Sequence, residues 1–461
     1  MPPVNAAAPS DETTPAEEHR AGASYRSVLR FYVPLCFTAV ANMSTNSIVN
    51  AGLARTPDPT ITLAAYGVAR GVLSLIDSFL QTIRPATVAL VKSERSYEMV
   101  LKAVVAQALF MMACIGVTAL TPFGDWLFAH VLGLTAPVAD GARAAMAVFL
   151  PMPVVMAWRS FQQGMLIANK VTNNVLVGAV SRPVLCALLM ALFLMLGQST
   201  PGVVLGAAAL VTVILVEGII LRFLILKGRY SWNRVFRPEE PGIATSYRAV
   251  FLFLLPLFAQ TYLKTITQPI LDGTMARGLN PTVSLAVFAL SWQFARLFVG
   301  PANMVHQVSL VIGKDGPSRA VCYRASIGIG LVLSSCLLAM SAAAAAGFVF
   351  RALFALPAEL TPLAQQVLLA ISPVPVLIAW REYYWGLLLQ RGTTGLIGTG
   401  KALGVAVTII AGALGISHVP LPGAVVAGLA MTSGELAESA VVVWYARRSS
   451  AADQTGNPSR S

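Results

Sequence analysis

Residues that could take part in chemistry lie inside long apolar segments of this sequence, where ionisable side chains are rare. One helical stripe of polar side chains runs through residues 28–50 and consists of Thr38, Asn42, Thr45, Asn46 and Asn50. A matching stripe farther along carries Lys264, Gln268 and Asp272. A charge inside a membrane costs roughly 2.5 to 3.5 kcal/mol and usually faces a cavity or a partner. The two stripes therefore predict polar walls inside a membrane protein.

Two more apolar segments extend these walls. The first carries Arg70, Ser74, Asp77, Gln81 and Arg84, and the second carries Gln293, Arg296, Asn303, His306 and Gln307. Together with Lys264, the guanidinium and ammonium groups predict a net-positive cavity, and a mixed Arg/Lys site suits a polyanion. Asp77 is seven residues from both Arg70 and Arg84 and could neutralise either. The predicted substrate-binding residues are Asn42, Asn46, Arg70, Asp77, Lys264, Gln268 and Arg296. The amides could instead join helices by hydrogen bonds.

A proline-rich run occurs twice. Pro151-Met152-Pro153 leads to Ala157-Trp158-Arg159, and Pro373-Val374-Pro375 leads to Ala379-Trp380-Arg381. Prolines free backbone groups that must find other partners, so either arginine could cap a kinked helix or reach toward the membrane surface, or serve in gating. The predicted gating or coupling residues are Arg159, Arg381, Glu382, Asp272, Glu435 and Glu438. We interpret His306 as structural.

The composition indicates a membrane protein: 56% of residues are hydrophobic, 11% are charged, and mean hydropathy is +0.71. About twelve apolar segments are long enough to span a bilayer. The formal charge of +12 comes from short loops, so it predicts topology and no nucleic-acid partner. By the positive-inside rule both termini are cytoplasmic, in the plasma (inner) membrane. The five cysteines show no metal-ligand spacing. We therefore expect no metal and no cofactor, and we leave coupling to H+ or Na+ open.

An internal repeat divides the chain. The numbering of the two proline-rich runs differs by a constant offset (373 − 151 = 222), and the same offset relates Pro34 to Pro256 and Gly178 to Gly400. Because each half has six spans, the copies are parallel, a transporter architecture with its substrate site between the halves. The predicted fold is an all-α polytopic protein with two six-helix lobes. Its predicted parts are a disordered tail (1–24), the first lobe (25–229), a cytoplasmic linker (230–246), the second lobe (247–448) and a disordered tail (449–461).

The sequence resembles the progressive ankylosis protein family, a branch of the superfamily that includes multidrug and toxic compound extruders (MATE transporters). The clearest similarities are Asn50-Ala51-Gly52-Leu53-Ala54, Leu63-Ala64-Ala65-Tyr66-Gly67, Leu90-Val91-Lys92-Ser93-Glu94-Arg95, Ala157-Trp158, Pro373-Val374-Pro375-Val376, Gly434-Glu435 and Glu438-Ser439. The resemblance implies two six-helix bundles around a central cavity and export of small polyanions such as citrate, pyrophosphate or nucleotides. Multidrug extruders tend to hold a coupling carboxylate in the first span, and residues 28–50 contain none.

These observations predict a secondary transporter, an exporter of a small anionic solute that works as a monomer in the bilayer. The alternatives are a flippase for lipid-linked glycans or lipids, and a MATE-type multidrug exporter. A membrane-embedded enzyme is not expected, because the spans lack a Ser/His/Asp arrangement, an HExxH motif and clustered metal ligands.

Overall fold

The computed structural model is almost entirely helical. It describes residues 23–454 except 133, 197–199, 228–245, 276, 278–279, 343–346, 349 and 351–357. In this part of the chain, ten helices are long and apolar enough to cross a membrane, and a pair bent by 47° brings the number to eleven. Helix α1 (Tyr25–Leu53) is 29 residues long, but its polar stripe lowers its hydropathy. These observations confirm the predicted polytopic all-α fold.

The first lobe contains the helices up to residue 227. They are α1, α2 (Pro59–Asp77), the 3₁₀ turn η1 (Ser78–Thr82), α3 (Ile83–Leu90), α4 (Glu94–Leu120), α5 (Pro122–Asp125), the π-helical η2 (Trp126–Val131), α6 (Ala136–Val148), α7 (Met152–Ala168), α8 (Thr172–Leu196) and α9 (Gly202–Lys227). The second span breaks at η1 because Pro85 lacks an N–H and its ring conflicts with the carbonyl four residues earlier. The fourth span breaks before α7, where Pro151 and Pro153 begin the helix.

The second lobe repeats this arrangement. Its elements are α10 (Tyr247–Met275), α11 (Pro281–Ala302), α12 (Val305–Val311), α13 (Gly316–Met340), η5 (Ala358–Leu360), α15 (Thr361–Ile371), α16 (Val374–Arg391), α17 (Gly395–His418) and α18 (Gly423–Gln454). Pro373 and Pro375 begin α16, as their counterparts begin α7. The predicted linker lies mostly outside the described residues, and α18 continues six residues into the segment predicted as a tail.

Matching glycines show that the repeat extends to side-chain packing. A Cβ atom on Gly164 of α7 would lie 2.7 Å from the Thr87 side chain and 3.0 Å from the Arg84 carbonyl oxygen of α3. A Cβ atom on Gly386 of α16 would meet the Ser309 hydroxyl and the His306 carbonyl oxygen of α12. Each pair of positions keeps the constant offset of the repeat. The same helix–helix contact is therefore built twice.

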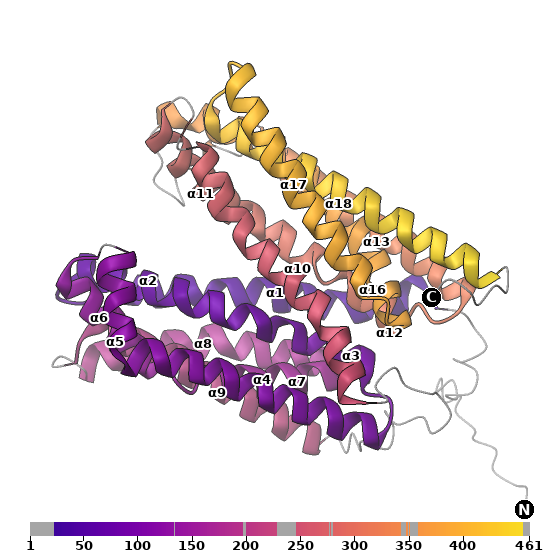
Figure 1. Cartoon of the computed structure of the whole chain (residues 1–461), viewed down its shortest axis with the longest axis horizontal. Coiled ribbons are helices and arrows are strands. Elements are labelled where there is room, and N and C mark those ends of the chain that lie inside the picture. The colour runs from indigo at the N-terminus through magenta and orange to yellow at the C-terminus, as the bar shows by residue number, and fades with distance from the viewer. Residues whose placement is uncertain are drawn as a thin grey trace, which may run out of the picture.

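The two lobes contact each other around the broken spans. Helix α3 contacts α12 and α16, η1 contacts α10, and α1 contacts α11 and α13. The Tyr32 hydroxyl donates a buried hydrogen bond of 2.9 Å to the Pro301 carbonyl across this junction, and Phe79 stacks on Tyr262 with ring centroids 5.9 Å apart. From the junction the lobes diverge toward the end that carries α5 and α6, which gives the molecule a V shape (Figure 1).

Candidate functional site

A buried charge network occupies the second lobe and is centred on Arg381 of α16. Its guanidinium lies 2.5 Å from Glu435, 2.8 Å from Glu438 and 3.0 Å from the neighbouring Glu382. The side chains of Arg381, Glu382 and Glu438 are 5%, 3% and 2% exposed. Removing one partner of a buried pair costs about 3–5 kcal/mol because the other charge is left uncompensated. The network therefore fixes α16 against α18.

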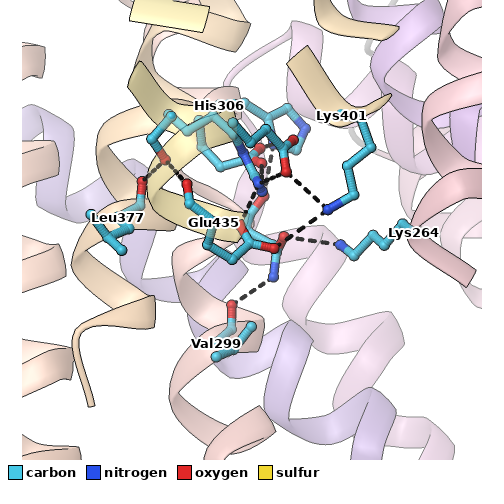
Figure 2. Close-up of polar contacts among 11 residues, drawn as sticks. Lys264, Val299, His306, Leu377, Lys401 and Glu435 are labelled. Carbon is cyan, nitrogen blue, oxygen red and sulfur yellow. Dashed lines mark hydrogen bonds and ion pairs between the residues drawn. The ribbon is translucent and has the colours of Figure 1, made fainter. Parts of the chain in front are cut away.

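Lys401 of α17 adds a second cation to this network. Its ammonium group lies 2.9 Å from Glu438 and 3.4 Å from Glu435 (Figure 2). Close approach of α17 to α18 allows this contact, because a Cβ atom on Gly404 would lie 2.9 Å from Glu438 Cβ and 3.0 Å from the Gly434 carbonyl oxygen. Two cations and three carboxylates thus share this buried volume, and Lys264 lies at its edge.

Lys264 of α10 connects the network to an accessible surface. Its ammonium group donates to Asn303 Oδ1 over 3.1 Å, and its side chain is exposed (Figure 2). His306 Nδ1 lies 2.7 Å from the Asn303 carbonyl oxygen and 2.8 Å from Glu382 Oε2. The Asn303 carbonyl oxygen can only accept a hydrogen bond, so it assigns the proton to Nδ1, and Glu382 Oε2 is a close electrostatic neighbour. A continuous polar path therefore leads from Lys264 through Asn303 and His306 to Glu382 and Arg381.

The first lobe has a buried network in the corresponding place. The Glu217 carboxylate of α9, which is fully buried, accepts hydrogen bonds from Arg159 (3.2 Å), from Gln163 (2.9 Å) and from Arg182 of α8. Arg84 of α3 interacts electrostatically with Glu217 and Arg182. Arg159 is thus tied to a carboxylate of the sixth span, as Arg381 is in the second lobe.

The other predicted residues of the first lobe lie outside this network. Asn46 is exposed, whereas Asn42 and Arg70 are half-buried. Asn42 Oδ1, Arg70 Nη1 and both carboxylate oxygens of Asp77 are buried without a hydrogen-bond partner among the described residues. Asp77 does interact electrostatically with Arg70, as one of the sequence alternatives supposed.

The remaining predicted residues of the second lobe lie apart from the network as well. Gln268 donates to Asp272 over 3.1 Å along the same face of α10. Arg296 of α11 is exposed and lies over the Trp292 ring, 5.7 Å from its centroid. Of the predicted substrate-binding set, only Lys264 joins the predicted coupling residues Arg381, Glu382, Glu435 and Glu438. The substrate and coupling roles of these residues stay predictions.

Sequence reasoning missed two cations of the networks. Lys401 and Arg182 are single cations within apolar spans, and that signal alone could have selected them. His306, which the sequence places on a polar wall and which we interpreted as structural, contacts Glu382 and packs against Trp385 with ring centroids 4.4 Å apart.

Comparison with known proteins agrees with this architecture. An outward-facing multidrug-resistance MATE transporter superposes with a TM-score of 0.76 at 15% identity, over 96% of this chain and 99% of that one. A second structure is a transporter of the same superfamily from Pyrococcus furiosus, whose binding pocket is described as having reversed polarity. It superposes with a TM-score of 0.73 at 15% identity, over 96% of this chain and 99% of that one. A Vibrio cholerae MATE transporter superposes with a TM-score of 0.72 at 14% identity, over 92% of this chain and 96% of that one. No curated protein matches the sequence.

These similarities show a shared fold at low sequence identity. The model of one family, the progressive ankylosis protein (ANKH) family, matches residues 16–280 of the sequence. This match covers more than half of the chain and includes the whole first lobe together with Lys264, Gln268 and Asp272. The chain is therefore a multi-pass integral membrane protein that belongs to the progressive ankylosis protein family.

Proposed function

We propose that this protein is a secondary transporter that exports a small polyanion, of the citrate, pyrophosphate or nucleotide type, by alternating access between its two lobes. In this proposal it is a monomer in the plasma (inner) membrane, with both termini in the cytoplasm, and it catalyses no reaction. The excess of Lys and Arg in the loops on one side supports this orientation.

The observation that carries the proposal is the position of Lys264. It lies within α10, a helix of 29 residues that is apolar enough to span a membrane, yet its side chain is exposed. A lysine at this depth is costly unless it meets water or a partner. Its ammonium group donates a hydrogen bond to a neutral amide, that of Asn303. An accessible cation with a neutral partner suits an anionic solute.

Arg296 supports the same assignment from the next helix. Its side chain is exposed and its guanidinium group lies over the aromatic face of Trp292. A guanidinium on an aromatic ring keeps its N–H groups free to bind carboxylate or phosphate oxygens, often two at a time. Lys264 and Arg296 together would supply a point charge and a planar fork.

Coupling to protons is the second element of the proposal. Histidine is the side chain that most readily changes charge between pH 5 and 8, and His306 lies between Asn303 and Glu382. Protonation would add a charge beside Glu382, Arg381 and Lys264. This would favour a Glu382–His306 pair and release Arg381 toward Glu435 and Glu438. Coupling to Na+ is the other possibility.

Flux through proteoliposomes tests the proposal. Vesicles containing the purified protein are loaded with labelled citrate, pyrophosphate or ATP, and efflux is measured. We expect Lys264→Gln to reduce flux roughly 10- to 100-fold, as loss of a charged hydrogen bond would, while Lys264→Arg keeps part of it. Lys102→Gln is the matched control, because Lys102 is exposed and pairs with Glu98 at 3.9 Å on one face of α4.

Two results would overturn the polyanion assignment. The first is efflux of a cationic dye with no efflux of any of the three anions, which would indicate a MATE-type multidrug exporter. The second is movement of a fluorescent lipid or lipid-linked glycan between leaflets without anion flux, which would indicate a flippase.

A further inference from the structure

The two buried networks differ in their balance of charge. In the second lobe the two cations Arg381 and Lys401 share the three carboxylates of Glu382, Glu435 and Glu438. In the first lobe three arginines, Arg84, Arg159 and Arg182, surround the carboxylate of Glu217. Among the described residues, no other carboxylate pairs with these arginines. The first network therefore carries an excess of two positive charges.

The repeat explains where the missing carboxylates would be. Glu382 corresponds to Ser160 at the constant offset of the repeat. In the sixth span the offset is smaller by one, because Gly178 faces Glu217 and Gly400 faces Glu438, and Glu435 then corresponds to Ile214. His306 corresponds to Arg84. The first lobe thus lacks two acids of the second and has an arginine in place of a histidine.

The excess charge is buried and incompletely hydrogen-bonded. Arg159 and Arg182 are 8% and 6% exposed, and Ser160 is 7% exposed. Arg159 Nε and Arg84 Nε are both buried without a partner within the described part of the chain. Burying unpaired charge inside a membrane-spanning lobe is expensive. A further negative charge beside these arginines would therefore stabilise the first lobe.

We propose that the first lobe binds an anion between Arg84 and Arg159, in the place that Glu382 occupies in the second lobe. The recognising chemistry is a negatively charged acceptor that takes hydrogen bonds from two guanidinium groups. A free halide or the carboxylate or phosphate group of a solute could supply it. The proposal does not depend on the transport function, since it follows from the charge of the folded lobe.

Thermal unfolding of the purified protein tests the site. An anion that binds only the folded state raises the melting temperature in a saturable way. Bromide and pyrophosphate are titrated separately, each against gluconate at equal ionic strength. A response to bromide identifies a halide site, and a response to pyrophosphate without one to bromide identifies the solute as the source. Either supports the proposal when Lys264→Gln, which removes the cation proposed for transport, keeps the response. A wild-type protein that responds to neither overturns it.

Transplanting residues between the lobes makes the test specific. Ser160→Glu places the second lobe's carboxylate beside the arginines, so we expect a higher melting temperature in gluconate and loss of the anion response. Arg84→His replaces the arginine with the histidine found at the corresponding position of the second lobe, and it is the second variant if Ser160→Glu does not fold. We expect it to weaken the anion response of the melting temperature at least several-fold. Arg95→His is the control, because Arg95 is an exposed arginine at the start of α4. The contrary result is that the anion raises the melting temperature of Ser160→Glu or of Arg84→His as much as that of wild type and Arg95→His. That result would show that the anion does not bind between Arg84 and Arg159.

Discussion

Arg381 of α16 lies 2.8 Å from the carboxylate of Glu438 on α18. In the first lobe Arg159 of α7 lies 3.2 Å from Glu217 on α9. The two arginines keep the constant offset of the repeat (381 − 159 = 222), and the two glutamates depart from it by one (438 − 217 = 221). The lobes therefore share one buried ion pair between their fourth and sixth spans, and they differ in the charges around it. Because of this difference, we expect Glu217 and Glu438 to contribute unequally to the stability of the protein.

Replacing the shared glutamates should have unequal effects. Glu217→Gln leaves Arg84, Arg159 and Arg182 without a paired carboxylate, so we expect a loss near the upper end of about 3–5 kcal/mol, the range for breaking a buried pair. Glu438→Gln should cost less, because Arg381 still has Glu382 and Glu435. Melting curves of the purified variants in one detergent measure both.

The control for these variants is Glu98→Gln, which removes an exposed partner of Lys102 and should change stability by at most about 1 kcal/mol. Equal destabilisation by Glu217→Gln and Glu438→Gln would mean that the uneven charge balance of the lobes does not govern their stability.

The repeat could be predicted from sequence because its proline, glycine and tryptophan residues recur at one constant offset in the two halves. Gly164 and Gly386 keep the constant offset and pack on corresponding residues. The ion pairs could not be recognised in this way. The constant offset aligns Glu217 with Ser439, and only the packing around Gly178 and Gly400 reveals the shift by one position.

The pairing of residues within the two networks cannot be predicted from their spacing along one helix. Lys401 reaches Glu438 across 37 residues, and Arg182 reaches Glu217 across 35. These partners lie on separate spans, so helical periodicity places each on a face without saying which face it meets. The same limit applies to Arg296, whose charge was evident from sequence and whose position over Trp292 was not.

Substitution of the matched glycines should destabilise both lobes. Gly386→Ala would bring a methyl group against the His306 carbonyl oxygen, and Gly164→Ala would place one 3.0 Å from the Arg84 carbonyl oxygen. Because backbone atoms cannot move aside readily, we expect losses of about 1–3 kcal/mol, larger for Gly386→Ala. Thermal melting measures the losses.

The comparison variant is Gly328→Ala in α13. No atom lies within 4 Å of the added methyl group, so this change should be neutral or stabilise by up to about 1 kcal/mol through helix propensity. If Gly386→Ala proved as stable as Gly328→Ala, α16 and α12 would not be in close contact.

Removal of His306 should flatten the pH dependence of transport. Because the imidazole contacts Glu382, its protonation changes the charge beside the Arg381 network. We expect anion efflux from wild-type vesicles to depend on pH and efflux from His306→Asn vesicles to depend on it much less. His418→Asn is the matched control, because His418 is exposed at the end of α17. A His306→Asn profile identical to wild type would rule out this residue as the coupling group.

The junction between the lobes should open more easily without the Tyr32 hydroxyl. That group donates to the Pro301 carbonyl oxygen over 2.9 Å and is buried. A bond of this kind contributes about 0.5–1.5 kcal/mol, so Tyr32→Phe should shift the open–closed equilibrium of the junction roughly 2- to 13-fold. Hydrogen–deuterium exchange reports this opening as faster exchange in α12 and α3, which meet at the junction, with little change in α17. Tyr445→Phe, on α18 beside Trp444, should leave both regions unchanged. Equal exchange in α12 for wild type and Tyr32→Phe would show that this hydrogen bond does not hold the lobes together, and would leave the junction to the packing of Phe79 against Phe258 and Tyr262.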